Sequence, residues 1–64
     1  MTLDKARELL ATHVRMGSGY NRNAARLVLA EVQREHGQEA VDRLIRELGL
    51  EEAFGFRPGT RFRF

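Results

Sequence analysis

The residues whose types could support hydrolytic or metal chemistry include Asp4, His13, Ser18 and His36. Asp4, His13 and Ser18 are the residue types of a hydrolytic triad, but a triad is defined by geometry, and 64 residues leave little room for a substrate cavity. The histidines have no cysteine and no second histidine at helical spacing, so they outline no metal site. The sequence therefore predicts no catalytic residues, no metal or cofactor, no small-molecule substrate and no enzymatic activity.

A second candidate is an anion site at residues 17–23, GSGYNRN. Glycine permits backbone conformations in which N–H groups point toward an anion. The first N–H groups of a following helix could then hold that anion beside Arg22 and Arg26. The segment has no preceding strand and no complete G-x-G-x-x-G or Walker pattern. We favour an ordinary loop in which Asn23, or alternatively Asn21, caps the next helix.

The strongest feature is the C-terminal tail, residues 54–64, which reads FGFRPGTRFRF and carries three Arg and no acid. Residues 1–53 are close to neutral, with eight Lys or Arg against nine Asp or Glu. Arginine binds carboxylate and phosphate through paired N–H groups, although a genome rich in G and C would also favour it. The candidate contacts with a partner protein or nucleic acid are Arg57, Arg61, Arg63, Phe62 and Phe64, extended by Arg22 and Arg26.

The length allows one domain, residues 1–64, with a single core that buries about 60% of the unfolded surface. Without cysteine, packing or self-association must supply the stability. The longest apolar run, Leu27 to Ala30, is far below the ~18 residues of a membrane span, and no basic segment followed by an apolar stretch opens the chain. We expect a cytoplasmic protein without a membrane span.

Apolar residues recur at three- and four-residue spacing in three segments. Thr2 is a suitable cap for the first helix, and Gly17 is a natural end for it. The predicted helices cover residues 3–16, 24–36 and 38–48.

Gly37 decides whether the second and third segments form one helix. At ~100° per residue, the apolar stripes on either side of Gly37 would face about 160° apart on a continuous helix. A break there lets both stripes meet one core. Gly49 then ends the third helix, with Leu50 as the hydrophobic residue after the cap.

The tail also holds four of the five aromatic residues, and burying one Phe stabilises a domain by ~1.5–3 kcal/mol. We expect at least Phe54 and Phe56 to pack on the helices. Pro58 and Gly59 fit a type II turn, after which Thr60, Phe62 and Phe64 alternate with Arg61 and Arg63. The predicted fold is an all-α, compact three-helix domain, with a helical body at residues 1–53 and a packed tail that is either an extended strap or a short strand.

Three functions fit this pattern. The favoured one is a small module for protein–protein interaction or self-association, because the body is neutral and the core needs the phenylalanines. The second is nucleic-acid binding through the tail arginines and phenylalanines. Recognition of DNA by the third helix is rejected, since it exposes acidic as well as basic residues. Membrane-surface attachment by the tail is the weakest of the three.

Overall fold

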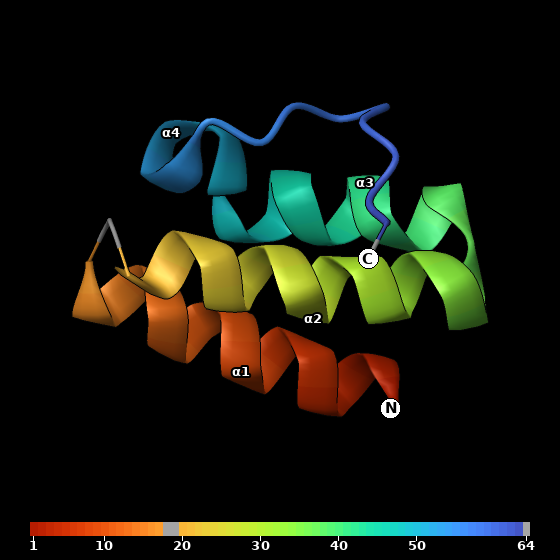
Figure 1. Ribbon diagram of the computed structural model, residues 1–64, viewed down its shortest axis with the longest axis horizontal. Helices are drawn as coiled ribbons and strands as arrows, with labels where there is room; N and C mark the ends of the chain where they lie inside the picture. Colours follow the sequence, from red (N-terminus) through yellow and green to blue (C-terminus); the bar gives the residue numbers. More distant parts are fainter. Residues whose placement is uncertain (18–19, 64) are drawn as a thin grey trace.

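The computed structural model describes residues 1–17 and 20–63, the side chain of Tyr20 excepted, and contains four helices in this part of the chain. They are α1 (Leu3–Met16), α2 (Tyr20–His36), α3 (Gln38–Leu48) and α4 (Leu50–Phe54). α2 packs between α1 and α3, while α4 contacts α3 and the tail runs back across α3 and α2 (Figure 1). The predicted all-α domain with three main helices is therefore confirmed, and α4 is an addition to it.

The ends of α1 are those that the sequence predicts. Thr2 Oγ1 accepts the backbone N–H of Lys5 at 3.1 Å, which satisfies one of the unpaired donors of the first turn. At the other end, Gly17 has φ 99° and donates its N–H to the carbonyl oxygens of His13 and Val14.

Gly37 separates α2 from α3, as the opposed apolar stripes predict. Its φ of 89° is a conformation that favours glycine, and its N–H donates to the carbonyl oxygens of Val32 and Gln33, both at 3.2 Å. Gly49 ends α3 in the left-handed region, and Leu50 behind it is fully buried.

The predicted start of the second helix at residue 24 is wrong, because α2 begins at Tyr20. Asn21 and Asn23 lie inside the helix and do not cap it. Two tertiary contacts favour this extra turn: Asn21 Oδ1 lies 3.4 Å from His13 Nδ1 on α1, and Arg22 donates to the carbonyl oxygen of Phe54. Local turn propensity is a weak preference that such contacts override.

The helix α4 is absent from the sequence prediction, which placed Phe54 in the tail. Leu50 and Phe54 are both buried, so a single helical turn puts two apolar side chains into the core. Gly55, at φ 81°, ends α4 and donates its N–H to the carbonyl oxygen of Glu51 at 2.8 Å. The extended tail therefore begins at Gly55.

One core joins the helices and the tail. The expected packing of Phe54 and Phe56 is confirmed, at 7% and 4% exposure, and Phe62 joins them at 5%. None of the helices in the described residues is long and apolar enough to cross a membrane. The complete buried cluster is Ala6, Leu10, Ala25, Leu29, Ala30, Val32, Val41, Leu44, Ile45, Leu50, Phe54, Phe56 and Phe62.

Candidate partner-binding surface

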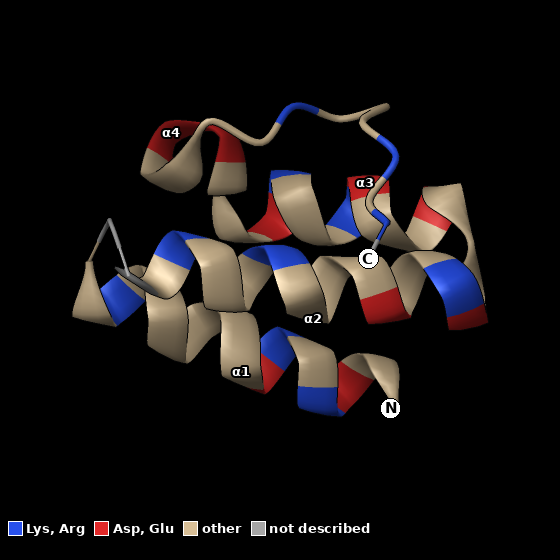
Figure 2. Cartoon of the chain, in the orientation of Figure 1, with Lys and Arg blue, Asp and Glu red and all other residues tan. Residues whose placement is uncertain are grey.

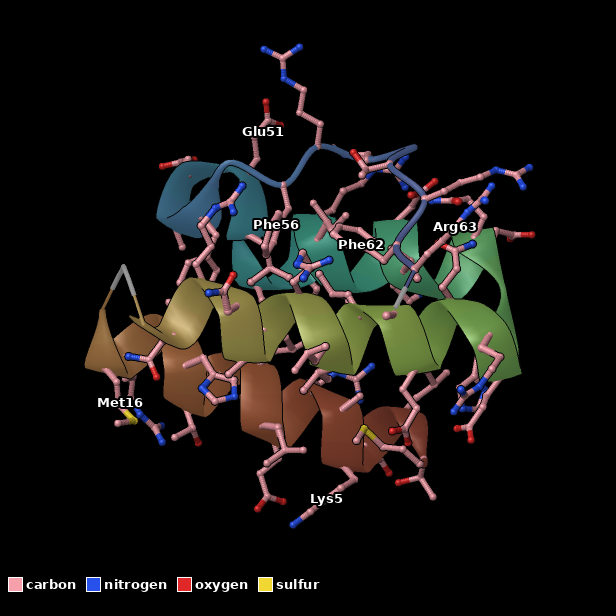
Figure 3. The ribbon with its side chains drawn as sticks, viewed as in Figure 1. Lys5, Met16, Glu51, Phe56, Phe62 and Arg63 are labelled. Atoms are coloured by element: carbon pink, nitrogen blue, oxygen red, sulfur yellow. The ribbon has the colours of Figure 1, made fainter. Side chains whose placement is uncertain are left out.

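Residues 55–63, here called the strap, are fixed to the body first by aromatic packing. The Phe56 ring lies 5.8 Å from that of Phe54 and 5.2 Å from that of Phe62, the second pair meeting edge to face at 84°. Phe56 and Phe62 point from the strap toward α2 and α3 (Figure 3). Edge-to-face rings add about 0.5–1.5 kcal/mol beyond the area that they bury.

Side chains of α3 hold the turn of the strap through its backbone. Asp42 Oδ1 accepts the N–H of Gly59 at 2.7 Å and the Nε2 amide of Gln38 at 2.9 Å. Gln38 Nε2 also donates to the carbonyl oxygen of Thr60 at 2.9 Å. These hydrogen bonds, that of Gly59 above all, hold the pKa of Asp42 below its ordinary value.

Side chains of α2 hold the two ends of the strap. At its start, Arg22 Nε donates to the carbonyl oxygen of Phe54 at 2.9 Å, while the guanidinium lies 4.9 Å from the centre of the Phe56 ring. Near its end, Gln33 Oε1 accepts the N–H of Phe62 at 3.4 Å. Arg26 donates to the carbonyl oxygen of Arg63 at 3.5 Å.

The backbone of the strap follows the predicted turn but forms no strand within the described residues. Thr60 donates its N–H to the carbonyl oxygen of Arg57 at 3.2 Å, and Gly59 has φ 93°, as the third position of a type II turn requires. Phe62 is buried while Arg61 and Arg63 are exposed, so the predicted alternation holds for these three. Thr60 departs from it because it is exposed, and Phe64 lies outside the described residues.

The fold brings together two parts of the chain that lack acidic residues, 9–30 and 53–64. Figure 2 shows basic residues, all of them Arg, and no Asp or Glu along the strap and the first half of α2 beside it. Five exposed arginines define this surface, which we call the arginine face. They are Arg22, Arg26, Arg57, Arg61 and Arg63.

The five arginines of the arginine face differ in the hydrogen bonds and ion pairs that they make within the chain. Arg22 donates to the carbonyl oxygen of Phe54 at the end of α4 and Arg26 to that of Arg63 on the strap, so both stabilise the fold as well as lining the surface. The side chain of Arg57 is 82% exposed and its Nε lies 3.9 Å from a carboxylate oxygen of Glu51. The side chains of Arg61 and Arg63 make no hydrogen bond or ion pair to any described residue.

Carboxylates away from the arginine face form ion pairs with basic groups on or beside α1. The amino group of Met1 lies 2.7 Å from Glu35 and 3.3 Å from Glu31, and the hydrogen bond to Glu35 raises the pKa of this amino group. Arg7 bridges Asp4, at 2.8 Å, and Glu47 of α3.

The exposed side of α3 carries both signs of charge. A cavity of about 390 Å³ there is lined by two acids and two arginines, Glu39, Arg43, Arg46 and Glu47. No three His, Asp or Glu residues in the described part of the chain come together to form a potential metal site.

The structure places the five predicted arginines on one surface, and their role as contacts stays a prediction, whereas the side chains that hold the strap were not predicted from the sequence. Gln33, Gln38 and Asp42 look like ordinary polar residues of helix surfaces, and nothing in their spacing shows that a distant backbone contacts them. Phe62, a candidate contact, points into the core. No protein-family model matches the chain, and no curated protein or solved structure shows significant similarity to it.

Proposed function

We propose that this protein is a non-enzymatic protein–protein interaction module that docks on its partner through the arginine face. The observation that carries the proposal is that side chains of α2 and α3 fix the strap at four backbone positions, and Arg22 fixes the carbonyl oxygen of Phe54 just before it. Its arginines project from an ordered backbone, which lowers the entropy cost of binding. Arginine is also enriched among the residues that dominate interface energies.

Nucleic-acid binding is the second candidate, because the arginine face contains no acid and arginine also pairs with phosphate. Two observations rank it lower. Phe54, Phe56 and Phe62 are buried, so their rings are not available to stack on bases. Five arginines also fall short of the about six to ten phosphate contacts that strongly bound duplex DNA uses.

Site-specific crosslinking in the source cell tests the proposal. A photo-crosslinking amino acid replaces Arg61 on the strap or, as the control, Lys5 of α1 on the opposite side of the molecule (Figure 3). After nuclease treatment, we expect a discrete protein adduct from position 61 and none from position 5. The mass of the adduct shows whether the partner is another protein or a second copy of this chain.

Two results would count against docking of a protein on the arginine face. Adducts that disappear with nuclease would place nucleic acid on the arginine face. Equal adducts from both positions would show that proteins meet this chain without using that face.

A further inference from the structure

We infer that the partner presents an acidic, extended polypeptide segment, whose Asp and Glu carboxylates lie along the arginine face. This inference rests on the proposed function and names the chemistry of the partner. Its basis is charge complementarity: the strap and the first half of α2 offer five arginines and no acid, whereas the exposed side of α3 mixes both signs.

The unused hydrogen-bond donors on the strap favour carboxylates. Arg61 and Arg63 offer complete guanidinium groups, and Arg57 has only the distant contact to Glu51 at 3.9 Å. Each planar guanidinium matches a carboxylate with two parallel N–H donors. Asp42, which lies beside the turn of the strap, already accepts from Gly59 and Gln38, so its charge is partly satisfied inside the fold.

The dimensions of the molecule set the length of the segment. The principal extents are 25 × 22 × 21 Å. An extended chain rises about 3.3 Å per residue, so about seven residues cross one face. The large apolar side chains that the described residues expose are Met16 and Leu27, and neither belongs to the strap, so the strap offers polar rather than apolar contacts.

The test uses the full chain and a fluorescent peptide of about seven residues, rich in Glu and free of basic residues. Binding is measured by anisotropy at low and at about 0.15 M salt, and mapped by amide chemical shifts. The test variant combines Arg57→Gln, Arg61→Gln and Arg63→Gln. The matched control combines Lys5→Gln, Arg15→Gln and Arg43→Gln, which removes the same charge elsewhere. Thermal melts verify that both variants remain folded.

We expect the peptide to shift amides of the strap and of the first half of α2. The strap variant should weaken binding by about tenfold or more, and the control by less than about twofold. Equal weakening in the two variants, or no binding by the wild type, would overturn the inference. Neither result would affect crosslinking at position 61, so the proposed function would stand.

An oligothymidylate of about seven nucleotides is the competing probe. If it binds more tightly than the peptide and the strap variant alone loses it, the face is a nucleic-acid site. That outcome would overturn both this inference and the proposed protein partner.

Discussion

Arg22, in the first turn of α2, lies with its guanidinium 4.9 Å from the centre of the Phe56 ring, and its Nε donates to the carbonyl oxygen of Phe54 at 2.9 Å. One side chain thus contacts the end of α4 and the start of the strap. The contact joins residues 32 positions apart, and it explains why the chain is helical where turn-forming residues predict a loop.

Arg22→Lys should lower the free energy of unfolding by about 1 kcal/mol. A lysine ammonium cannot stack as a plane on the Phe56 ring and also donate in the fixed direction of Nε. Urea denaturation measures the change. Arg57→Lys is the control and should change stability by less than about 0.5 kcal/mol, because Arg57 is 82% exposed. Equal effects of the two changes would show that the Arg22 contact contributes nothing specific.

The strap should be necessary for the folded state. Phe56→Ala removes a ring that contacts Phe54 and Phe62 in the core, and such changes lower the free energy of unfolding by about 3–5 kcal/mol. Deleting residues 54–64 removes all three rings, so the cooperative thermal transition should be lost. Circular dichroism and calorimetry measure both effects.

Met16→Ala is the control for Phe56→Ala, because it also truncates a large apolar side chain. Met16 is 67% exposed, so this change should leave the free energy of unfolding nearly unchanged. A truncated chain that melts as sharply and at as high a temperature as the full chain would contradict a structural role for the strap.

The helices could be predicted largely from the sequence because the residues that set their ends and buried faces lie within the helices or next to them. Apolar spacing, the Thr2 cap and the glycines at 37 and 49 act within a few residues of the helix ends that they set. The start of α2 and the anchors of the strap depend on contacts such as Gly59 with Asp42, which are 17 residues apart. No periodic pattern encodes such a pair, so only the folded chain reveals it.

Gly37→Ala should lower the free energy of unfolding by about 1 kcal/mol or more. Gly37 has φ 89°, a conformation that a residue with Cβ rarely adopts, so the penalty lies in the backbone. Apart from Gly37 itself and its two neighbours in the chain, no heavy atom lies within 4 Å of the added Cβ, so a clash with packed side chains contributes nothing. Chemical denaturation measures the change.

Asn23→Ala provides the contrast, since Asn23 is exposed inside α2. Alanine has the higher helix propensity, so this variant should gain a few tenths of a kcal/mol. A more stable Gly37→Ala protein would argue that α2 and α3 can form one continuous helix.

The contact between Asp42 and the strap should make stability depend on pH in the acid range. The hydrogen bonds from Gly59 and Gln38 lower the pKa of Asp42 in the folded protein below its ordinary value of 3.8. A lowered folded pKa means that the folded state favours the carboxylate. The stabilisation is therefore complete above pH 3.8 and is lost as the pH falls through the folded pKa.

Asp42→Asn should therefore melt at a lower temperature than the wild type at pH 7, and the difference should shrink as the pH falls below 3.8. Glu39→Gln, on the same helix, is the control, because Glu39 makes no hydrogen bond to the strap and its variant leaves the contact between Asp42 and Gly59 in place. The melting temperatures of all three proteins across pH 2–7 give the comparison. A constant difference for Asp42→Asn over the whole range would show that the charge of Asp42 does not hold the strap.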